Sequence, residues 1–192
     1  MSTSAFFQRS HINTVPIAQR VKKVYACELD PLNVAILKEN IVLNAVQRQV
    51  TILPFACGSS AELVDVTFRD LAYGDALQLI AGGEDLGTRL EQLSHAASIV
   101  QFSLDEIFIQ LKLSFPNKIK IDVDGNEETV LRGLKGLLAT ANEIYFEESF
   151  TVACKNFVDF LTELGFQEKD SAEIFSNDGT SKLLGFNRIF QK

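Results

Sequence analysis

The sequence predicts an α/β fold: a mostly parallel sheet with helices on both faces and an antiparallel hairpin at the C-terminus. Apolar runs typical of strands alternate with helical patterns of roughly a dozen residues, which is the signature of crossover units and therefore of parallel strands. The clearest unit is "KIKIDV" (118–123) followed by a helical stripe over 127–138. Near the C-terminus, two apolar runs flank the turn "SNDGTS", so we expect them to pair as a hairpin.

The first predicted strand is "VYACE" (24–28), a short apolar run that ends in an acid. Asp30 then fits a helix N-cap and Pro31 fits the first helical position. Apolar residues at helical spacing continue this helix, and Asn44 is a suitable stop signal.

A second strand is predicted at "VTILPF" (50–55), ending at 56–58, and a weaker third one at "AELVDVTF" (61–68). Residues 69–98 show no sustained period and contain four glycines. We expect an irregular insert there, with a short helix near 88–93.

The second half of the chain repeats the alternation. Ser103 and Glu106 form a capping box that opens a helix within 102–113. The remaining predicted elements are a strand at 118–123, a helix at 127–138, a strand at 143–148, a helix at 153–164 that stops at Gly165, and hairpin strands at 166–170 and 183–190.

Composition narrows the function classes. The 192 residues are most simply one domain, 1–192, large enough to bury a core. A net charge of −7 argues against a nucleic-acid partner and against an anionic membrane surface. No apolar run approaches the ~18 residues of a membrane span, and the first residues lack the apolar core of a signal peptide. Three cysteines far apart in sequence suggest reduced thiols, so we expect a cytoplasmic protein.

Acidic residues gather where the predicted strands end: Glu28, Asp122, Asp124, Glu147 and Glu148. Ligands of open parallel sheets bind outside these carboxyl ends. Glu127 and Glu128 are also explained by the helix dipole, which favours acids in a first turn. Asp122 and Asp124 precede the helix, so we interpret them as the lip of a ligand crevice. Glu28 fits a ribose-binding acid, a surface residue or a helix-capping partner.

Several other sites are excluded by the sequence. "DVDGN" resembles part of a calcium loop, but aligning Gly125 with the invariant glycine puts Lys120 and Leu131 at ligand positions. There is no GxSxG, HExxH, Walker or GxGxxG motif, and we predict no metal site. A histidine mechanism would have to use His11 or His95, which lie in segments without a predicted element.

Together these stretches resemble the FkbM family of S-adenosylmethionine-dependent methyltransferases, which have a Rossmann-like fold. The resemblance spans roughly residues 24–150 and is carried by "VYACELDPLNVAILKENIVLN", "VTILPFACGS", "FSLDEI", "KIKIDVDGNEETVLRGLKGLL" and "EIYFEES". Its most specific part is the lysine-led strand followed by Asp122, an apolar residue, Asp124, Gly125 and Glu127.

The resemblance implies S-adenosyl-L-methionine as cofactor and O-methylation of a sugar or natural-product hydroxyl. It places Glu28, with the neighbouring Leu29, at the cofactor ribose, and Phe55, Ala56 and Cys57 near the adenine. It places Asp122 at the methionine part and the acceptor, as a candidate base or an orienting group, and Asp124 and Glu127 on the acceptor side. The particular acceptor and the oligomeric state stay open.

The resemblance also predicts a glycine-rich acidic loop after the first strand, which this sequence lacks. The corresponding segment reads "AFFQRSHINTVPIAQR", with no glycine and no acid, and the first glycine is Gly58. We therefore expect residues 1–23 to be a diverged or truncated part, with "SAFF" as a residual strand and "INTVPIAQRV" as part of the first helix. The alternative function is a catalytically inactive relative that acts as a binding or scaffold subunit.

Overall fold

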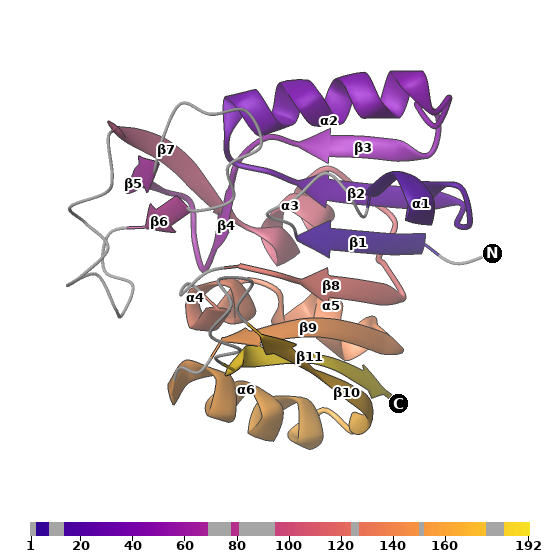
Figure 1. Ribbon diagram of the computed structural model, residues 1–192, viewed down its shortest axis with the longest axis vertical. Coiled ribbons are helices and arrows are strands. Elements are labelled where there is room, and N and C mark those ends of the chain that lie inside the picture. Colours follow the sequence, from indigo (N-terminus) through magenta and orange to yellow (C-terminus); the bar gives the residue numbers. More distant parts are fainter. Residues whose placement is uncertain are drawn as a thin grey trace.

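The computed structural model describes residues 3–7, 14–68, 78–80, 95–123, 127–149, 152–175 and 183–192. Within them, seven strands form the main sheet (Figure 1): β1 (Thr3–Phe7), β2 (Lys23–Cys27), β3 (Val50–Leu53), β8 (Lys118–Ile121), β9 (Glu143–Ser149), β10 (Gln167–Phe175) and β11 (Leu183–Gln191). The helices are α1 (Thr14–Ala18), α2 (Pro31–Leu43), α3 (Leu104–Gln110), α4 (Glu127–Arg132), α5 (Lys135–Thr140) and α6 (Val152–Glu163).

The strand order of the main sheet is β10-β11-β9-β8-β1-β2-β3. Strands β3, β2, β1, β8 and β9 are parallel, whereas β11 runs antiparallel to both β9 and β10. The predicted α/β class and C-terminal hairpin are confirmed. The chain starts in the middle at β1, runs outward to β3 and then returns to β8 on the other side of β1. This reversal creates a switch point between β1 and β8, where α/β sheets bind ligands.

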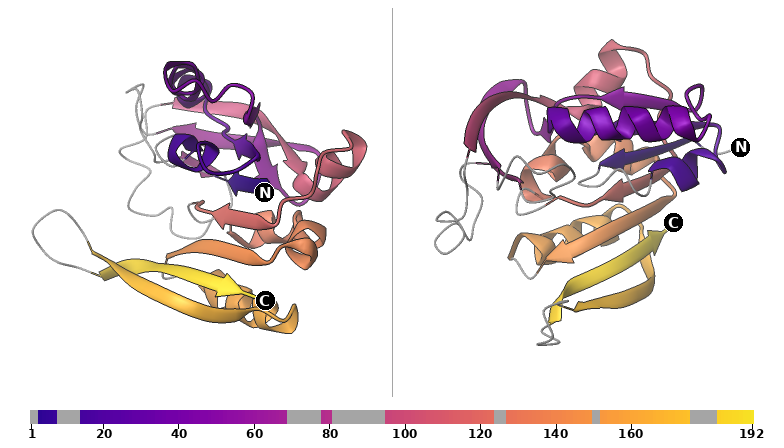
Figure 2. Two further views of the ribbon diagram at one scale, coloured as in Figure 1. Left: turned by 90° about the vertical axis from the view of Figure 1, so that its right-hand side faces the viewer. Right: turned by 45° about the horizontal axis from the view of Figure 1, so that its top comes forward.

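Helices lie on both faces of the main sheet (Figure 2), and an apolar cluster packs between the helices and the sheet on each face. On one face, α1 and α2 pack against β2 and β3 through residues such as Val24, Ala26 and Leu37. On the other face, α3 to α6 cover a larger cluster that includes Ile119, Ile121, Phe146 and Phe190. At β8, β9 and β11, the face of the sheet that corresponds to the one covered by α1 and α2 carries mainly polar side chains. This explains why Ile119 and Ile121 are buried while the alternating Lys118 and Lys120 are not.

A second sheet lies beyond the carboxyl ends of the parallel strands (Figure 1). It contains β4 (Ala56–Gly58), β5 (Glu62–Phe68), β6 (Gln78–Ile80) and β7 (His95–Ser103), in the order β4-β7-β5-β6. The third predicted strand is therefore real, but it pairs antiparallel with β7 rather than in the main sheet. The expectation of an irregular insert over 69–98 was wrong for β6 and the start of β7. The short helix expected near 88–93 lies outside the described residues.

The predicted helix boundaries of α2 are confirmed. The Asp30 carboxylate accepts a hydrogen bond from the backbone N–H of Leu32 at 2.7 Å, and Asn44 follows the last helical residue. Ser103 Oγ likewise accepts from Glu106 N at the start of α3. Gly165 ends α6 with a φ of +85°, a conformation that glycine adopts without a steric penalty.

The single helix predicted over 127–138 was wrong, because two short helices, α4 and α5, stand there. They are separated at Gly133, whose carbonyl oxygen accepts bonds from Asp105 N at 2.9 Å and Ser103 Oγ at 3.0 Å. The Asp105 carboxylate then accepts from the N–H groups of Gly136 and Leu137, which begin α5. Contacts with α3 thus replace the helical bonds at the break, a tertiary effect that the apolar spacing does not reveal.

The N-terminal part contains both elements expected from "SAFF" and "INTVPIAQRV": β1 sits between β2 and β8, and α1 packs on β2. The linking segment 8–13 reads "QRSHIN" and lies outside the described residues, as do His11 and the turn at 176–182. In the described part of the chain, no helix is long and apolar enough to cross a membrane.

Candidate functional site

One row of paired residues crosses the carboxyl edge of the parallel sheet. Leu53, Cys27, Phe7, Ile121 and Phe146 are register partners on β3, β2, β1, β8 and β9 in turn. The residues that directly follow Leu53, Cys27, Ile121 and Phe146 therefore lie at the same level, at the edge where parallel sheets bind ligands.

Three acids occupy this level: Glu28 after β2, Asp122 after β8 and Glu147 in β9. Neighbouring strands are ~4.8 Å apart. The backbone of Glu28 is then about 10 Å from that of Asp122, because β1 lies between them, and Glu147 is about 5 Å beyond Asp122. The edge thus presents Glu28 on one side of the β1–β8 switch point, and Asp122 and Glu147 on the other.

Glu28 is the most buried of these acids, with 6% of its surface exposed. Its Oε1 accepts a hydrogen bond from the backbone N–H of Asp30 at 2.9 Å, and its own N–H donates to the Leu53 carbonyl. These bonds fix the carboxylate at the end of β2, directly before α2. The 6% exposure shows that the surface-residue interpretation of Glu28 was wrong. The ribose-binding and helix-capping interpretations are both compatible with this geometry, because a carboxylate oxygen can accept more than one hydrogen bond.

Asp122 forms an ion pair with Lys120, and the side chains of both are about one-seventh exposed (13% and 15%). The two residues are two positions apart on β8, so their side chains share a face of the sheet. Lys120 is not among the site residues predicted from the sequence, although its i, i+2 spacing from Asp122 indicates that the two side chains lie on the same face of the sheet. The Lys120 ammonium group holds the Asp122 carboxylate in place at the carboxyl edge of the sheet.

The chain beyond β3 supplies the apolar side of the edge. Phe55 and Phe102 meet edge to face with ring centroids 5.2 Å apart. Ala56 is fully buried, and Cys57 and Leu29 are half-buried. The partly exposed Phe55 ring thus lies just past β3, the strand next to that of Glu28.

Two predicted acceptor-side residues have no described side chain. Asp124 lies outside the described residues, and Glu127 is the first residue of α4 but its side chain is also outside them. The structure therefore brings together Glu28, Phe55, Ala56, Cys57 and Asp122, with Leu29 adjoining.

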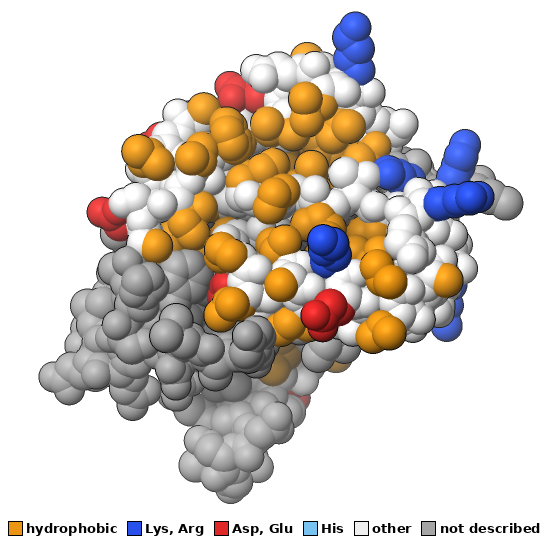
Figure 3. Space-filling view, turned by 90° about the horizontal axis from the view of Figure 1, so that it is seen from above, with side chains coloured by type: hydrophobic (Ala, Val, Ile, Leu, Met, Phe, Trp, Pro, Cys, Tyr) orange, Lys and Arg blue, Asp and Glu red, His pale blue; other side chains and the backbone are white. Residues whose placement is uncertain are grey.

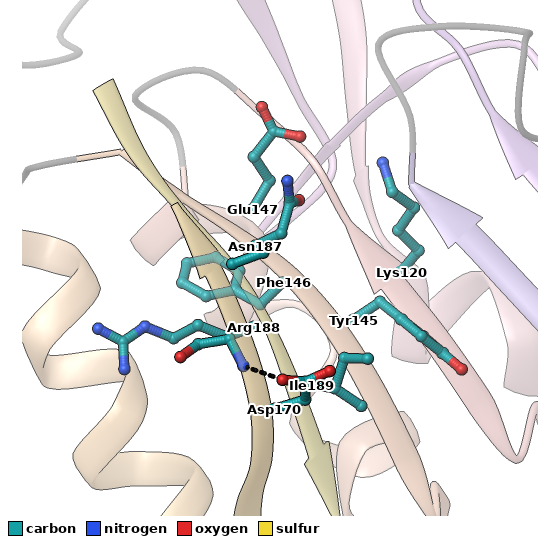
Figure 4. A pocket seen from close by; sticks show the side chains of 10 residues that line it. Lys120, Tyr145, Phe146, Glu147, Asp170, Asn187, Arg188 and Ile189 are labelled. Carbon is teal, nitrogen blue, oxygen red and sulfur yellow. Dashed lines mark hydrogen bonds between the residues drawn. The ribbon is translucent and has the colours of Figure 1, made fainter. Parts of the chain in front are cut away.

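A shallow pocket of about 260 Å³ opens on the polar face of β8, β9 and β11, next to this edge (Figure 4). Lys120, Tyr145, Glu147 and Asn187 line it from three strands, and Asp170 and Ser171 line it from β10. Lys120 lines this pocket and also pairs with Asp122, so the pocket lies next to the carboxyl edge of the sheet.

Tyr145 and Glu143 form a hydrogen-bonded pair on the same face of β9. Burial raises the pKa of Tyr145, and the hydrogen bond to Glu143 and its negative charge raise it further, to about 12. Burial also acts to raise the pKa of Glu143, but hydrogen bonds from Lys118, Tyr145 and Gln191 outweigh it, so that pKa lies below its usual value.

We expect Tyr145 to remain protonated when ordinary tyrosines ionise. Because its folded pKa is raised, its contribution to stability is complete below pH ~10 and is lost as the pH rises toward about 12. A tyrosinate absorbance titration should show one late transition, which Tyr145→Phe removes. Glu143→Gln should move it to lower pH without abolishing the shift, since burial is the larger cause. An unchanged curve for Tyr145→Phe would contradict this assignment.

The arrangement of strands, with the edge and the switch point just described, defines the Rossmann-like methyltransferase fold. Over its full length the chain resembles a methyltransferase FkbM from Methylobacillus flagellatus KT, with a TM-score of 0.63 and 11% identity. It also resembles TrmK from M. capricolum, solved with S-adenosyl-homocysteine, with a TM-score of 0.58, 13% identity and 62% of that chain covered. An rRNA methylase from Streptococcus thermophilus matches with a TM-score of 0.58, 9% identity and 86% of its chain covered.

The sequence itself matches the profile of the methyltransferase FkbM domain over residues 9–168. The protein belongs to this family. The resemblance found in the motifs is thereby confirmed, and the match begins well before residue 24. The chain spans 43% of the length of the Methylobacillus protein. No curated protein sequence matches it significantly.

Proposed function

We propose that this protein is an S-adenosyl-L-methionine-dependent methyltransferase that methylates a hydroxyl oxygen of a sugar or another small molecule. The observation that carries the proposal is the sheet edge, where Glu28, the Phe55 ring and Asp122 stand around the switch point of a methyltransferase fold. Membership of the FkbM domain family supports the same reading.

The residues at the edge fit an adenosine cofactor. A buried carboxylate at the end of β2 is suited to accept hydrogen bonds from two adjacent ribose hydroxyls. The half-buried Phe55 ring, just past the strand next to that of Glu28, offers an apolar contact for a base. When bound, S-adenosyl-L-methionine would supply the methyl group on its sulfonium.

We assign Asp122 a role toward the acceptor. Methyl transfer asks the protein to hold a hydroxyl in line and to accept its proton, rather than to form a covalent bond. The Asp122 carboxylate can accept a hydrogen bond from that hydroxyl and take its proton, or it can orient the cofactor, while Lys120 keeps the carboxylate in position. From the family motif, we also assign Asp124 and Glu127 to the side of the site that binds the acceptor.

The proposed acceptor is a small molecule rather than a nucleic acid, although one of the similar structures is an rRNA methylase by name. The net charge is −7, which repels phosphate backbones. The face beside α2 and β3 is covered largely by apolar side chains with few Lys or Arg among them (Figure 3). Nucleic-acid-binding domains typically carry Lys and Arg clustered on one face or along a helix.

Calorimetric titration with S-adenosylhomocysteine tests the proposal. We expect one binding site and a dissociation constant on the order of 10 μM, about −7 kcal/mol. A folded protein that gives neither heat nor a thermal shift at millimolar ligand would contradict the proposal.

That outcome would favour the second candidate, an inactive relative that serves as a binding subunit. The observation in its favour is the segment "QRSHIN" between β1 and α1, which has neither glycine nor an acid where the family has a glycine-rich acidic loop. Binding of S-adenosylhomocysteine would show that the edge residues hold a cofactor without that loop.

A further inference from the structure

Two cysteines that are far apart in sequence lie together beneath the proposed cofactor crevice. Cys27 is the last residue of β2 and is buried, with 4% of its surface exposed. Cys57 is the central residue of β4 and is half-buried. Both pack into the same apolar cluster as Leu53, the register partner of Cys27 on β3, and the two side chains are near enough to interact.

The surroundings give the two thiols different reactivity. Burial raises the pKa of Cys27, and the hydrogen bond and charge of Cys57 and the charge of Glu28 raise it further. Cys27 therefore stays a thiol at neutral pH and is shielded from solvent. Cys57 is the member of the pair that a small oxidant in the crevice can reach, because it is half-buried rather than buried.

We propose that Cys27 and Cys57 form a reversible disulfide when the protein meets a peroxide, and that this bond prevents cofactor binding. The second part rests on the proposed function. The pair is a modification site built into the cofactor crevice, of the transient kind that cytosolic proteins use to sense oxidants.

The chemistry proceeds in two steps. The Cys57 sulfur attacks one oxygen of hydrogen peroxide; the O–O bond breaks, one water leaves, and Cys57 becomes a sulfenic acid. The Cys27 sulfur then attacks the Cys57 sulfur, the S–O bond breaks, and a second water carries away the thiol proton of Cys27. Overall, two thiols lose two electrons and two protons to the peroxide. A dithiol reductant reverses the change.

The bond would reshape the crevice because sulfur atoms in contact must approach to ~2.05 Å. That movement pulls β4 toward the end of β2. Glu28 follows Cys27 directly and Ala56 precedes Cys57, so the ribose-binding and adenine-binding groups move with the two sulfurs. The disulfide would fix Glu28 and Ala56 at a different separation, and this lowers the affinity for a ligand that contacts both.

The test compares reduced and peroxide-treated protein, with Cys154→Ser as the background variant. Cys154 lies in α6, outside the pair. After oxidation, alkylation under denaturing conditions and digestion without reductant, mass spectrometry should find the Cys27 and Cys57 peptides joined, with the loss of two hydrogen masses. Calorimetry with S-adenosylhomocysteine should show at least a tenfold weaker affinity for the oxidised form, restored by a dithiol reductant.

Cys57→Ser and Cys27→Ser should each abolish the cross-link, and peroxide should leave the affinity of each variant where it was before treatment. The pairing is refuted if Cys57 is over-oxidised or alkylated while Cys27 stays a free thiol. The switch is refuted if the disulfide forms and affinity is unchanged. If the reduced protein binds no S-adenosylhomocysteine, the methyltransferase proposal and the switch fail together, while the mass spectrum still decides the pairing.

Discussion

Replacing Glu28 by alanine should weaken S-adenosylhomocysteine binding by about a hundredfold or more. In the proposed site the carboxylate accepts two hydrogen bonds from ribose hydroxyls, and bonds to a charged group contribute about 1.5–3 kcal/mol. Each 1.4 kcal/mol corresponds to about a factor of ten in the dissociation constant. Calorimetric titration of wild type and variant measures the difference directly.

Two variants separate this role from helix capping. Asp30→Ala removes the carboxylate that caps α2 through Leu32 N, so it should cost about 1 kcal/mol of stability and leave affinity unchanged. Glu28→Gln keeps an acceptor for Asp30 N but loses the charge, so it should fold like wild type and still bind more weakly. If Glu28→Ala binds as tightly as wild type, Glu28 is only a structural residue.

Replacing Gly133 by alanine should destabilise the protein by about 3 kcal/mol or more, a large part of the ~5–15 kcal/mol that holds a typical domain together. A Cβ at this position would lie 1.7 Å from the carbonyl oxygen of Gly58 and 2.8 Å from its carbonyl carbon. Both are backbone atoms of β4, which is paired with β7 and cannot move aside cheaply.

Gly136→Ala is the matched control, because it lies in the adjacent helix α5 and meets only the Asp105 carboxylate, at 3.1 Å. A side chain can shift by the few tenths of an ångström required, and alanine favours a helix over glycine. We expect a change within about 1 kcal/mol. Urea unfolding of both variants provides the comparison. A Gly133→Ala protein within that same margin of wild type would show that α4 and β4 are not in close contact.

Local signals in the sequence determined most of the elements. Asp30, Pro31 and Asn44 specify both ends of α2, and Gly165 specifies the end of α6, because caps and turn residues act on their immediate neighbours. The alternation in 118–121 likewise specifies β8. Where the expectation failed, at β6, β7 and the α4–α5 break, the deciding contacts come from distant parts of the chain.

The candidate site divides in the same way. The sequence by itself determined which acids end the parallel strands, since an acid directly after an apolar run marks a carboxyl edge, and the motif around Asp122 determined the family. Only the tertiary structure decided that Lys120 holds Asp122, that Cys27 meets Cys57, and that Gly133 must be glycine. Pairing register and helix packing set these contacts, and both depend on side chains that are remote in sequence and adjacent only after folding.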